Sequence, residues 1–237
     1  MGIYLNPNND NYREIVNSNI FIDKSLLIEK TNEIVGCKDC KLCVTRPRRF
    51  GKTTDADMLV TYYSKGNNAA DVFDELNISN DALYKKHLNK HNVIFLNMQD
   101  FLSLSQTTEE LIKRISKFIM IELKKEFPDV YYYLDSELSF SLLNINDQTG
   151  QKFIFIIDEW DCIFRSTTKY DYEKYLSFLT ALLKDQPYVE LVYMTGILPI
   201  KKTGTHSGLN MFKEITMITS FGYSKFMGFT SDEVKAL

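Results

Sequence analysis

A basic turn that contains one glycine carries the clearest chemical signal in this sequence. Its residues 46–53 read RPRRFGKT and align with the phosphate-loop pattern G-x-x-x-x-G-K-[ST], except that Arg46 stands where the first glycine belongs. Such a loop turns its backbone N–H groups toward phosphate oxygens, and the start of the following helix adds partial positive charge. The pattern therefore predicts a cradle for the phosphates of a nucleotide; a basic surface turn before a helix is the alternative.

Each part of this turn has an expected role toward ATP and Mg²⁺. Gly51 lets the backbone approach the phosphates, Lys52 bridges the β- and γ-phosphates, and the hydroxyl of Thr53 is a magnesium ligand. Arg48 and Arg49 either add charge against the phosphates, which we favour because both lie within the loop, or bind acidic side chains elsewhere. The residues expected to contact the nucleotide are Arg48, Arg49, Phe50, Gly51, Lys52, Thr53 and Thr54.

An apolar run that ends in two acids forms the second motif. Residues 153–157 read FIFII, and Asp158 and Glu159 follow directly. In a phosphate-transferring site the first acid holds magnesium, usually through water, and the second polarises the attacking water. A solvated acidic turn after a buried strand is the alternative, but the order of the two motifs favours the joint interpretation. Trp160, the only tryptophan, comes next, so we expect its indole to lie close to the magnesium and the γ-phosphate.

A third candidate lies at the end of a further apolar strand. Thr195 fits a polar residue that senses the γ-phosphate from the tip of a strand inserted between those of the other two motifs, although a plain turn residue would look the same. Lys201, Lys202 and His206 follow on a loop that either closes over the nucleotide or is solvated, and we favour the solvated state.

The elements that must position these motifs alternate between strands and helices. The strands are expected at residues 41–45, 93–97, 153–157, 189–193 and, for a short fifth one, near 226–229. Helices are expected from 52 to about 63 and around 175–183, which predicts an α/β fold with a mostly parallel sheet flanked by helices. No repeat or Gly/Ser/Pro-rich linker interrupts the chain, so residues 1–237 are expected to form one domain.

Two pairs of capping residues announce further helices. Thr107 and Glu110 form a capping box, and apolar residues then recur at helical spacing until Pro128. Thr230 and Glu233 form a second box for a helix of barely two turns, too short to be stable alone. We therefore expect this chain to be the front part of a longer protein, cut off before a C-terminal effector domain.

Composition narrows the class of protein. The chain has 237 residues, 44% of them hydrophobic and 25% charged, with a formal net charge of −3. These values are ordinary for a folded domain and argue against a surface that is basic throughout, as a general nucleic-acid binder would have. The N-terminus lacks the basic and apolar regions of a secretion signal, and no apolar run approaches the ~20 residues that span a bilayer. We expect a cytoplasmic protein without membrane contact.

Three closely spaced cysteines could indicate a metal site. Cys37, Cys40 and Cys43 have the spacing C-x-x-C-x-x-C, which could suggest zinc or an iron–sulfur cluster. Cys43, however, lies in the strand expected before the phosphate loop, and no second cysteine pair or suitably spaced histidine completes a four-ligand set. We favour free thiols in a reducing compartment.

Taken together, the motifs resemble a known family, the bacterial AAA-ATPase-like proteins, whose members often join an N-terminal P-loop ATPase to a C-terminal PD-(D/E)XK nuclease-like domain. The resemblance covers essentially the full chain. It is carried by residues 21–28 (FIDKSLLI), 45–53 (TRPRRFGKT), 156–161 (IIDEWD) and 195–202 (TGILPIKK). The TRPRRFGK[ST] block is highly specific, so the missing first glycine is the family's own variant of the loop.

The resemblance implies a five-stranded parallel sheet of the additional-strand, catalytic-glutamate type. It also implies that the segment Asp23-Lys24 packs near the nucleotide base. The acidic and lysine residues of a nuclease have no counterpart in this chain, so nuclease activity is not carried over. Any contact with nucleic acid would come through the full-length protein, and self-association or contact with the C-terminal domain is the other expected interaction.

The function expected from these signals is ATP binding and Mg²⁺-dependent hydrolysis that drives or gates an attached effector. The catalytic residues would be Lys52, Glu159 and Thr195, and the magnesium ligands Thr53 and Asp158. The alternative is a nucleotide-binding switch or scaffold that does not hydrolyse ATP. Glu159 favours the enzyme, because a pure binder has no need of a water-polarising acid. A small-molecule kinase shares the loop but does not require the acidic pair in this form.

Overall fold

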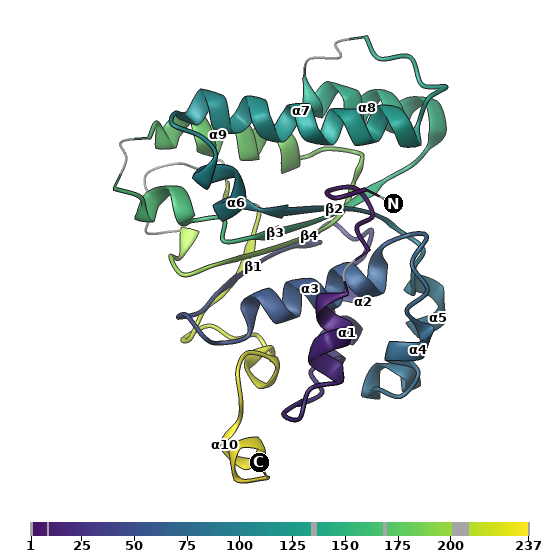
Figure 1. The fold of residues 1–237 in the computed structure, drawn as a ribbon, viewed down its shortest axis with the longest axis vertical. Helices are drawn as coiled ribbons and strands as arrows, with labels where there is room; N and C mark the ends of the chain where they lie inside the picture. Colours follow the sequence, from purple (N-terminus) through teal and green to yellow (C-terminus); the bar gives the residue numbers. More distant parts are fainter. Residues whose placement is uncertain (1, 9, 134–136, 168–169, 201–208, 237) are drawn as a thin grey trace.

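A five-stranded parallel sheet forms the middle layer of the structure (Figure 1). The computed structural model describes residues 2–8, 10–133, 137–167, 170–200 and 209–236. The strands found there are β1 (Lys41–Thr45), β2 (Asn92–Asn97), β3 (Phe153–Asp158), β4 (Val189–Gly196) and β5 (Lys213–Ile215). They lie in the order β2-β3-β4-β1-β5, and each pair of neighbours is parallel.

The position of β4 identifies the type of sheet. β4 pairs with β1 on one side and with β3 on the other, so one strand separates the strand before the basic turn from the strand that ends in two acids. This is the additional-strand arrangement, and it confirms the predicted P-loop fold class. All the carboxyl ends of a parallel sheet lie at one edge, which brings the ends of β1, β3 and β4 together.

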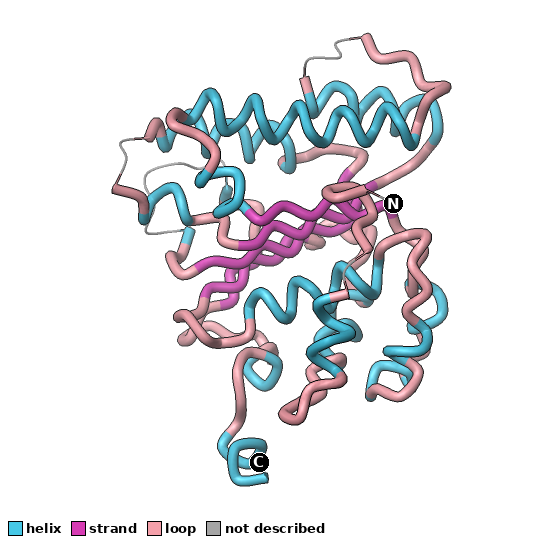
Figure 2. Tube along the Cα trace, viewed as in Figure 1, coloured by secondary structure: helices cyan, strands magenta, loops and turns pink. Residues whose placement is uncertain are grey.

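Helices cover both faces of this sheet (Figures 1 and 2). One layer contains α1 (Asn11–Val16), α2 (Leu26–Asn32), α3 (Lys52–Tyr63), α4 (Ala70–Phe73) and α5 (Tyr84–His87). The other contains α6 (Met98–Ser103), α7 (Thr108–Glu126), α8 (Leu138–Thr149) and α9 (Tyr172–Leu183). The short helix α10 (Ser231–Ala236) lies on the side of the first layer, near the C-terminus (Figure 1).

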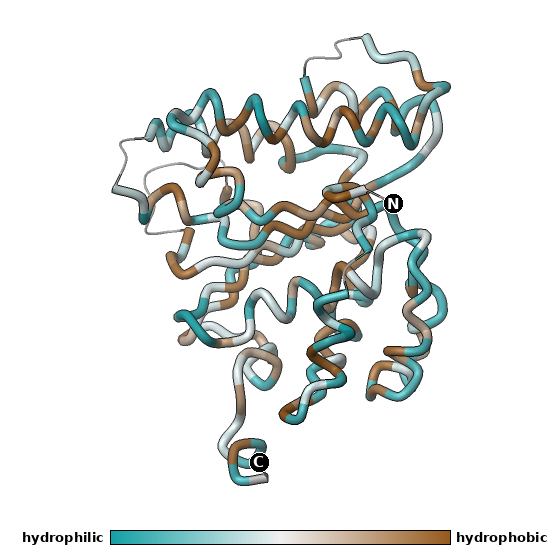
Figure 3. Tube along the Cα trace, viewed as in Figure 1, coloured by the Kyte–Doolittle hydropathy of each residue, from teal (hydrophilic) through white to brown (hydrophobic). Residues whose placement is uncertain are grey.

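Alternating side chains of the strands fill two separate apolar cores. In β3, Phe153, Phe155 and Ile157 pack toward α6–α9, whereas Ile154 and Ile156 pack toward α1–α5. Successive residues of a strand point to opposite faces, and a strand covered on both faces is apolar at every position. The brown strands between mixed helices in Figure 3 show this distribution. The sequence therefore marks β3 clearly as a central strand.

Capping and turn residues set the helix ends that the sequence predicts. The side chain of Thr107 accepts a hydrogen bond of 3.2 Å from the backbone N–H of Glu110, and α7 ends at Glu126, before Pro128. Thr230 and Glu233 form their box, with Glu233 accepting from the N–H of Thr230. The second predicted capping box is confirmed; in the first, the Thr107 cap forms, but the carboxylate of Glu110 accepts from the backbone N–H of Gln106 (2.9 Å) rather than from that of Thr107.

The predicted fifth strand was wrong. β5 is Lys213–Ile215, paired with β1, whereas residues 224–226 form a 3₁₀ turn. The apolar side chains of Phe226 and Met227 are buried in the core beneath the sheet, and Gly228 has a φ of 76°, which ends any extended conformation. The true strand has a single buried residue among its three, too little for a visible apolar pattern.

Among the helices of the described residues, none combines the length and the apolarity that crossing a bilayer requires.

Candidate functional site

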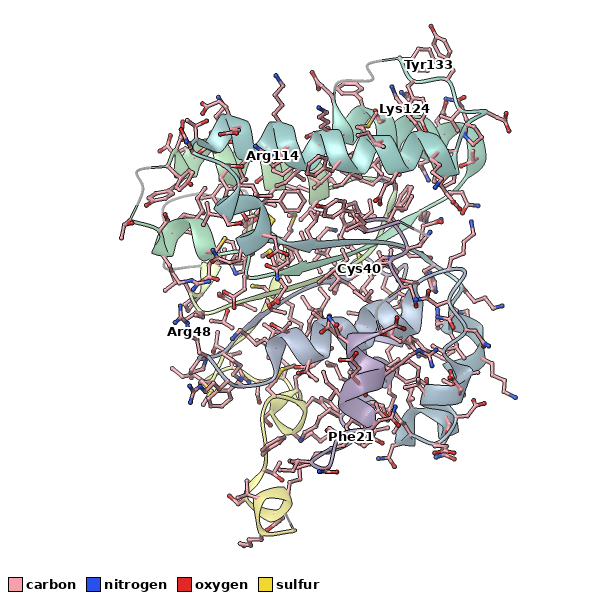
Figure 4. All side chains as sticks on the ribbon, viewed as in Figure 1. Phe21, Cys40, Arg48, Arg114, Lys124 and Tyr133 are labelled. Carbon is pink, nitrogen blue, oxygen red and sulfur yellow. The ribbon has the colours of Figure 1, made fainter. Side chains whose placement is uncertain are left out.

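The basic turn connects β1 to α3 at the carboxyl edge of the sheet. Gly51 caps α3 with a φ of 77°, in the left-handed region that residues with a Cβ rarely adopt, and Arg49 also has a positive φ, of 69°. Alternation of right- and left-handed residues turns successive N–H groups toward one side and makes an anion-binding concavity. Arg48 is exposed at this edge, where the turn leaves the sheet (Figure 4).

Lys52 is held inside the turn. It is the first residue of α3 and is 5% exposed, and its Nζ donates a hydrogen bond of 2.9 Å to the carbonyl oxygen of Pro47. The ammonium group therefore lies across the concavity, bonded to the backbone of the turn itself.

Arg46 explains how the turn does without its first glycine. The side chain is 3% exposed, and one guanidinium nitrogen donates to the carbonyl oxygens of Thr45 (2.9 Å) and Ile215 (3.1 Å). It thus extends toward the end of β5, away from Lys52, and ties β1 to the edge strand. Burial lowers the pKa of Arg46 below its usual value. A glycine is unnecessary at this position because the side chain leaves the concavity open.

Asp158 joins the three predicted elements of the site. It is fully buried at the end of β3. Its Oδ2 accepts a hydrogen bond of 2.8 Å from the hydroxyl of Thr53, and its Oδ1 accepts one from the hydroxyl of Thr195. A single carboxylate therefore connects the start of α3, the end of β3 and the end of β4.

Glu159 has a constrained backbone and a charged partner. Its φ of 56° is left-handed, which is uncommon for a residue with a Cβ and directs the side chain away from the strand. Its carboxylate forms an ion pair with the guanidinium of Arg165, at the end of the 3₁₀ turn Cys162–Arg165. The Nε of Arg165 also lies 3.2 Å from Oδ2 of Asp161.

These groups surround a cavity of about 620 Å³ at the carboxyl edge of the sheet. The wall made by the turn and α3 is basic. The facing wall, from the ends of β2 and β3 and the segments that follow them, carries carboxylates, amides and the guanidinium of Arg165. Its lining consists of Arg48, Arg49, Gly51, Lys52, Thr53, Thr54, Asn97, Gln99, Asp158, Glu159 and Arg165. The structure thus brings the two motifs together around one opening.

A second cavity, of about 370 Å³, adjoins the first along the turn. Arg49, Gly51 and Thr54 line both, and the second is otherwise largely apolar. Its remaining lining residues are Tyr12, Ile15, Ile20, Phe21, Ile22, Lys24, Asp55, Met58, Phe226, Gly228 and Phe229. Burial raises the pKa of Asp55 well above its usual range, although Lys24 and Lys52 act in the opposite direction.

The predicted nucleotide-contacting residues and the predicted catalytic residue Thr195 fall into three groups. Arg48, Arg49, Gly51, Lys52, Thr53 and Thr54 line a cavity. Phe50 lines neither, because its ring turns back to the C-terminal segment, where a Cβ on Gly228 would lie 3.0 Å from it. Thr195 is fully buried behind Asp158 and does not line the cavity itself.

The expectation for Trp160 was wrong. Its side chain is fully buried in the core on the α6–α9 side, where it packs against Phe164. The backbone turn at Glu159 sends the two successive side chains in different directions, the carboxylate into the cavity and the indole away from it. Its backbone N–H donates a hydrogen bond of 3.0 Å to the carbonyl oxygen of Thr195, and a Cβ on Gly196 would lie 2.5 Å from its Nε1.

The segment predicted to lie near a nucleotide base is split by the structure. Lys24 lines the second cavity, and its Nζ forms an ion pair of 2.6 Å with Glu233 of α10. Asp23 instead accepts hydrogen bonds from the backbone N–H groups of Ser25 (2.7 Å) and Asn77 (2.8 Å). Asp23 therefore shapes the segment while Lys24 faces the opening.

Several lining residues escaped sequence analysis. Arg165 carries no motif of its own, and its position depends on the turn at Glu159. Asn97 ends β2 and is paired in register with Asp158 of β3. A polar residue at the end of an apolar strand could therefore have indicated its place in the lining. Phe226 and Phe229 line the second cavity, which was not expected because they were predicted to lie in a strand.

Two further groups of predicted residues fall elsewhere. Lys201, Lys202 and His206 lie outside the described residues. Cys43 lies in β1, as predicted, and is buried, while Cys40 is buried and Cys37 exposed; all three are free thiols. Burial raises the pKa of Cys40, which makes its thiolate less available.

Comparison with known proteins gives a family and a distant structural likeness. The sequence matches the AAA-ATPase-like family, described as predicted AAA-ATPase, over residues 9–206. No curated protein matches it. Among solved structures, it is similar to a Walker-type ATPase of Pyrococcus abyssi, with 17% sequence identity, a TM-score of 0.40 and coverage of 73% of this chain. This chain spans 44% of the length of that protein.

Proposed function

This chain belongs to the AAA-ATPase-like family, and from that premise we propose that it binds ATP with magnesium and hydrolyses it to ADP and phosphate. The observation that carries the proposal is the hydrogen bond of 2.8 Å between Thr53 and Asp158. It puts the hydroxyl of the basic turn and the carboxylate of β3 at one point of a cavity that Lys52 and Glu159 also line. A phosphate site beside paired carboxylates suits phosphoryl transfer to water.

The residues fit a magnesium ion. Thr53 and Asp158 offer a hydroxyl and a carboxylate side by side, the hard oxygen donors that Mg²⁺ prefers. Asn97 and Gln99 add amide groups to the same lining. When bound there, magnesium would neutralise charge on the phosphate oxygens. Thr195 would act through Asp158, because its hydroxyl holds the carboxylate in place.

The chemical step assigns a separate task to each residue. The N–H groups of the turn and the ammonium of Lys52, released from Pro47, would bind the β- and γ-phosphates. The oxygen of a water molecule attacks the γ-phosphorus, and the bond from that phosphorus to the β–γ bridging oxygen breaks. Glu159 accepts the proton that the water loses, and the bridging oxygen leaves with ADP.

The second cavity would take the nucleoside. It is continuous with the turn through Arg49, Gly51 and Thr54, the direction in which the α-phosphate, ribose and base extend. Apolar and aromatic side chains such as Phe21 and Met58 suit the faces of a base. The same cavity is lined by Phe226 and Phe229, so a bound nucleoside would contact the C-terminal segment. Through that contact ATP would drive or gate an attached effector.

One observation favours a second candidate, a nucleotide-binding switch that hydrolyses ATP only slightly. The carboxylate of Glu159 is already paired with Arg165, and a carboxylate engaged in this way is not free to take a proton from water. Turnover distinguishes the two functions. The test is steady-state release of inorganic phosphate from Mg-ATP by the purified chain, with Lys52→Ala as the control for contaminating ATPases. Release that requires Lys52 supports the enzyme; ATP binding without Lys52-dependent release supports the switch.

A further inference from the structure

Arg165 occupies a position between two carboxylates at the acidic wall of the larger cavity. It ends the 3₁₀ turn that follows β3, and its side chain is 20% exposed. One terminal nitrogen of the guanidinium pairs with Glu159, while Nε lies 3.2 Å from Asp161. The cation is thus largely withdrawn from solvent but still lines the opening.

The Asp161 end of this arrangement is fixed. Asp161 is fully buried, and its Oδ2 accepts hydrogen bonds from the backbone N–H groups of Ile197 (3.1 Å) and Leu198 (2.8 Å). This carboxylate is held by the segment that follows β4 and cannot follow a moving partner. The Nε of Arg165 therefore lies beside a fixed negative charge, and the forked end of its guanidinium is the part that can change partners.

The Glu159 end is open to the cavity. The side chain of Glu159 is 24% exposed, against 0% for Asp161, and it lies in the same lining as Lys52 and Thr53. Any anion that enters beside Lys52 therefore meets the pair of Glu159 and Arg165 on the opposite wall. A guanidinium presents planar N–H pairs that match phosphate oxygens as well as carboxylate oxygens, and bidentate pairing with phosphate is among the strong charge-assisted contacts.

We propose that Arg165 is a γ-phosphate contact of the ATPase site, and that it exchanges its ion pair with Glu159 for the terminal phosphate of ATP. The inference rests on the proposed function. The exchange has two consequences. It puts a positive charge supplied by this chain itself against the charge of the transferring phosphoryl group, and it frees the carboxylate of Glu159 to accept the proton of the attacking water. ADP, which lacks the γ-phosphate, leaves the ion pair intact.

This exchange predicts a difference between nucleotides that a structural ion pair would not produce. Replacing Arg165 by alanine should weaken ATP binding by about tenfold, the low end for a charge-assisted contact because Arg165 must give up Glu159 to make it. ADP binding should change by less than about twofold. The value of kcat should fall on the order of 100-fold, as for loss of one donor to the developing charge. Arg165→Lys should restore part of the ATP affinity and part of kcat, since the ammonium group keeps the positive charge but lacks the paired N–H donors of the guanidinium.

Glu159 supplies an independent readout that requires no turnover. Because Glu159 competes with the γ-phosphate for Arg165, Glu159→Gln should tighten ATP binding by severalfold, and the gain should vanish in the double variant Glu159→Gln/Arg165→Ala. A double-mutant cycle measures this coupling directly. Arg114→Ala is the matched control, since Arg114 pairs with Glu110 on α7, across the sheet from the basic turn (Figure 4).

The experiment is calorimetric titration of the intact chain and these variants with Mg-ATP and Mg-ADP, alongside phosphate release and a melting curve for each variant. Selective loss of ATP affinity in Arg165→Ala, with coupling to Glu159, supports the exchange. Equal losses for ATP and ADP, or an ATP affinity and kcat that stay at the wild-type values, overturn it. If Arg165→Ala does not fold, the ATP affinities of Glu159→Gln and Arg165→Lys, compared with wild type, decide whether the exchange takes place.

Failure of the proposed function and failure of the inference give different results. If the wild type itself binds no ATP, or if Lys52→Ala leaves its ATP binding unchanged, the proposed function fails. A Lys52-dependent ATPase whose activity and ATP affinity do not change on replacing Arg165 rejects only the inference.

Discussion

The hydroxyl of Thr53 donates a hydrogen bond of 2.8 Å to the carboxylate of Asp158, so two segments far apart in the sequence meet within the protein itself. The contact follows from the sheet order. β4 inserts between β1 and β3, and the residues after the carboxyl ends of these strands come to the same edge. The contact is also the reason why a pattern in the basic turn and a pattern after β3 can be interpreted as one site.

Lys52→Ala should weaken Mg-ATP binding by about thirty- to a hundredfold, about 2–3 kcal/mol, because the phosphates lose the ammonium group at the start of α3. Titration calorimetry measures the affinity. Lys65→Ala is the control, since Lys65 lies just after the far end of α3 and pairs with Glu126 at the surface. If Lys52→Ala binds Mg-ATP as tightly as Lys65→Ala does, the basic turn does not bind the phosphates.

Asp158→Asn should abolish most of the effect of magnesium on ATP binding. The amide keeps the size of the side chain but lacks the charge that holds a divalent cation. The measurement is the ratio of ATP affinities in magnesium and in EDTA, which should fall toward one in the variant and remain as in wild type for the exposed Asp129→Asn. An unchanged ratio would mean that the cation is held elsewhere.

Arg46→Gly, which restores the first glycine of the phosphate-loop pattern, should destabilise the protein rather than improve it. The guanidinium satisfies the carbonyl oxygens of Thr45 and Ile215 at a buried position, and its loss costs about 1–3 kcal/mol of unfolding free energy. Urea denaturation measures the change. Arg48→Gly, at an exposed position of the same turn, is the control for the destabilising effect that a new glycine has by itself. A variant as stable as that control would show that Arg46 does not tie β5 to the sheet.

These residues show how far the sequence leads. The positions of β1 and β3 could be predicted because apolar runs buried on both faces have few alternatives, and the order of the motifs assigned Thr53 and Asp158 to one site. Arg165 could not be found, since its place beside Glu159 depends on a left-handed residue and a 3₁₀ turn that leave no pattern. The apolar residues at 226–229 were interpreted as a strand because burial against helices and burial in a sheet look alike over four positions.

A pH dependence of stability is expected at the opposite edge of the sheet. Nδ1 of His87 lies 2.9 Å from Nε2 of His91, and Nδ1 of His91 lies 2.8 Å from the carboxylate of Glu190. Burial first, and then the charges of His91 and Lys86, lower the pKa of His87 to about 4, while Glu190 and Asp81 act in the opposite direction. The folded state therefore prefers the neutral ring, so this contribution is fully present above about pH 6.5, the unfolded value, and is lost as the pH falls toward 4.

The unfolding free energy should accordingly decrease by up to about 3 kcal/mol between pH 6.5 and 4 through His87 alone. His87→Gln, which cannot titrate, should flatten this part of the profile. Denaturant titrations across this pH interval provide the measurement. A variant whose profile keeps the wild-type slope would assign the dependence to other groups.

Turnover by Glu159→Gln tests the central claim most directly. The amide can hold a water molecule but cannot accept its proton, so phosphate release should fall at least about 100-fold while Mg-ATP binding is retained. Glu75→Gln, on the surface, should behave as wild type. Both quantities come from one preparation, by calorimetry and a continuous phosphate assay. If the variant releases phosphate at the wild-type rate, Glu159 is not the base and the cavity is not the hydrolytic site described here.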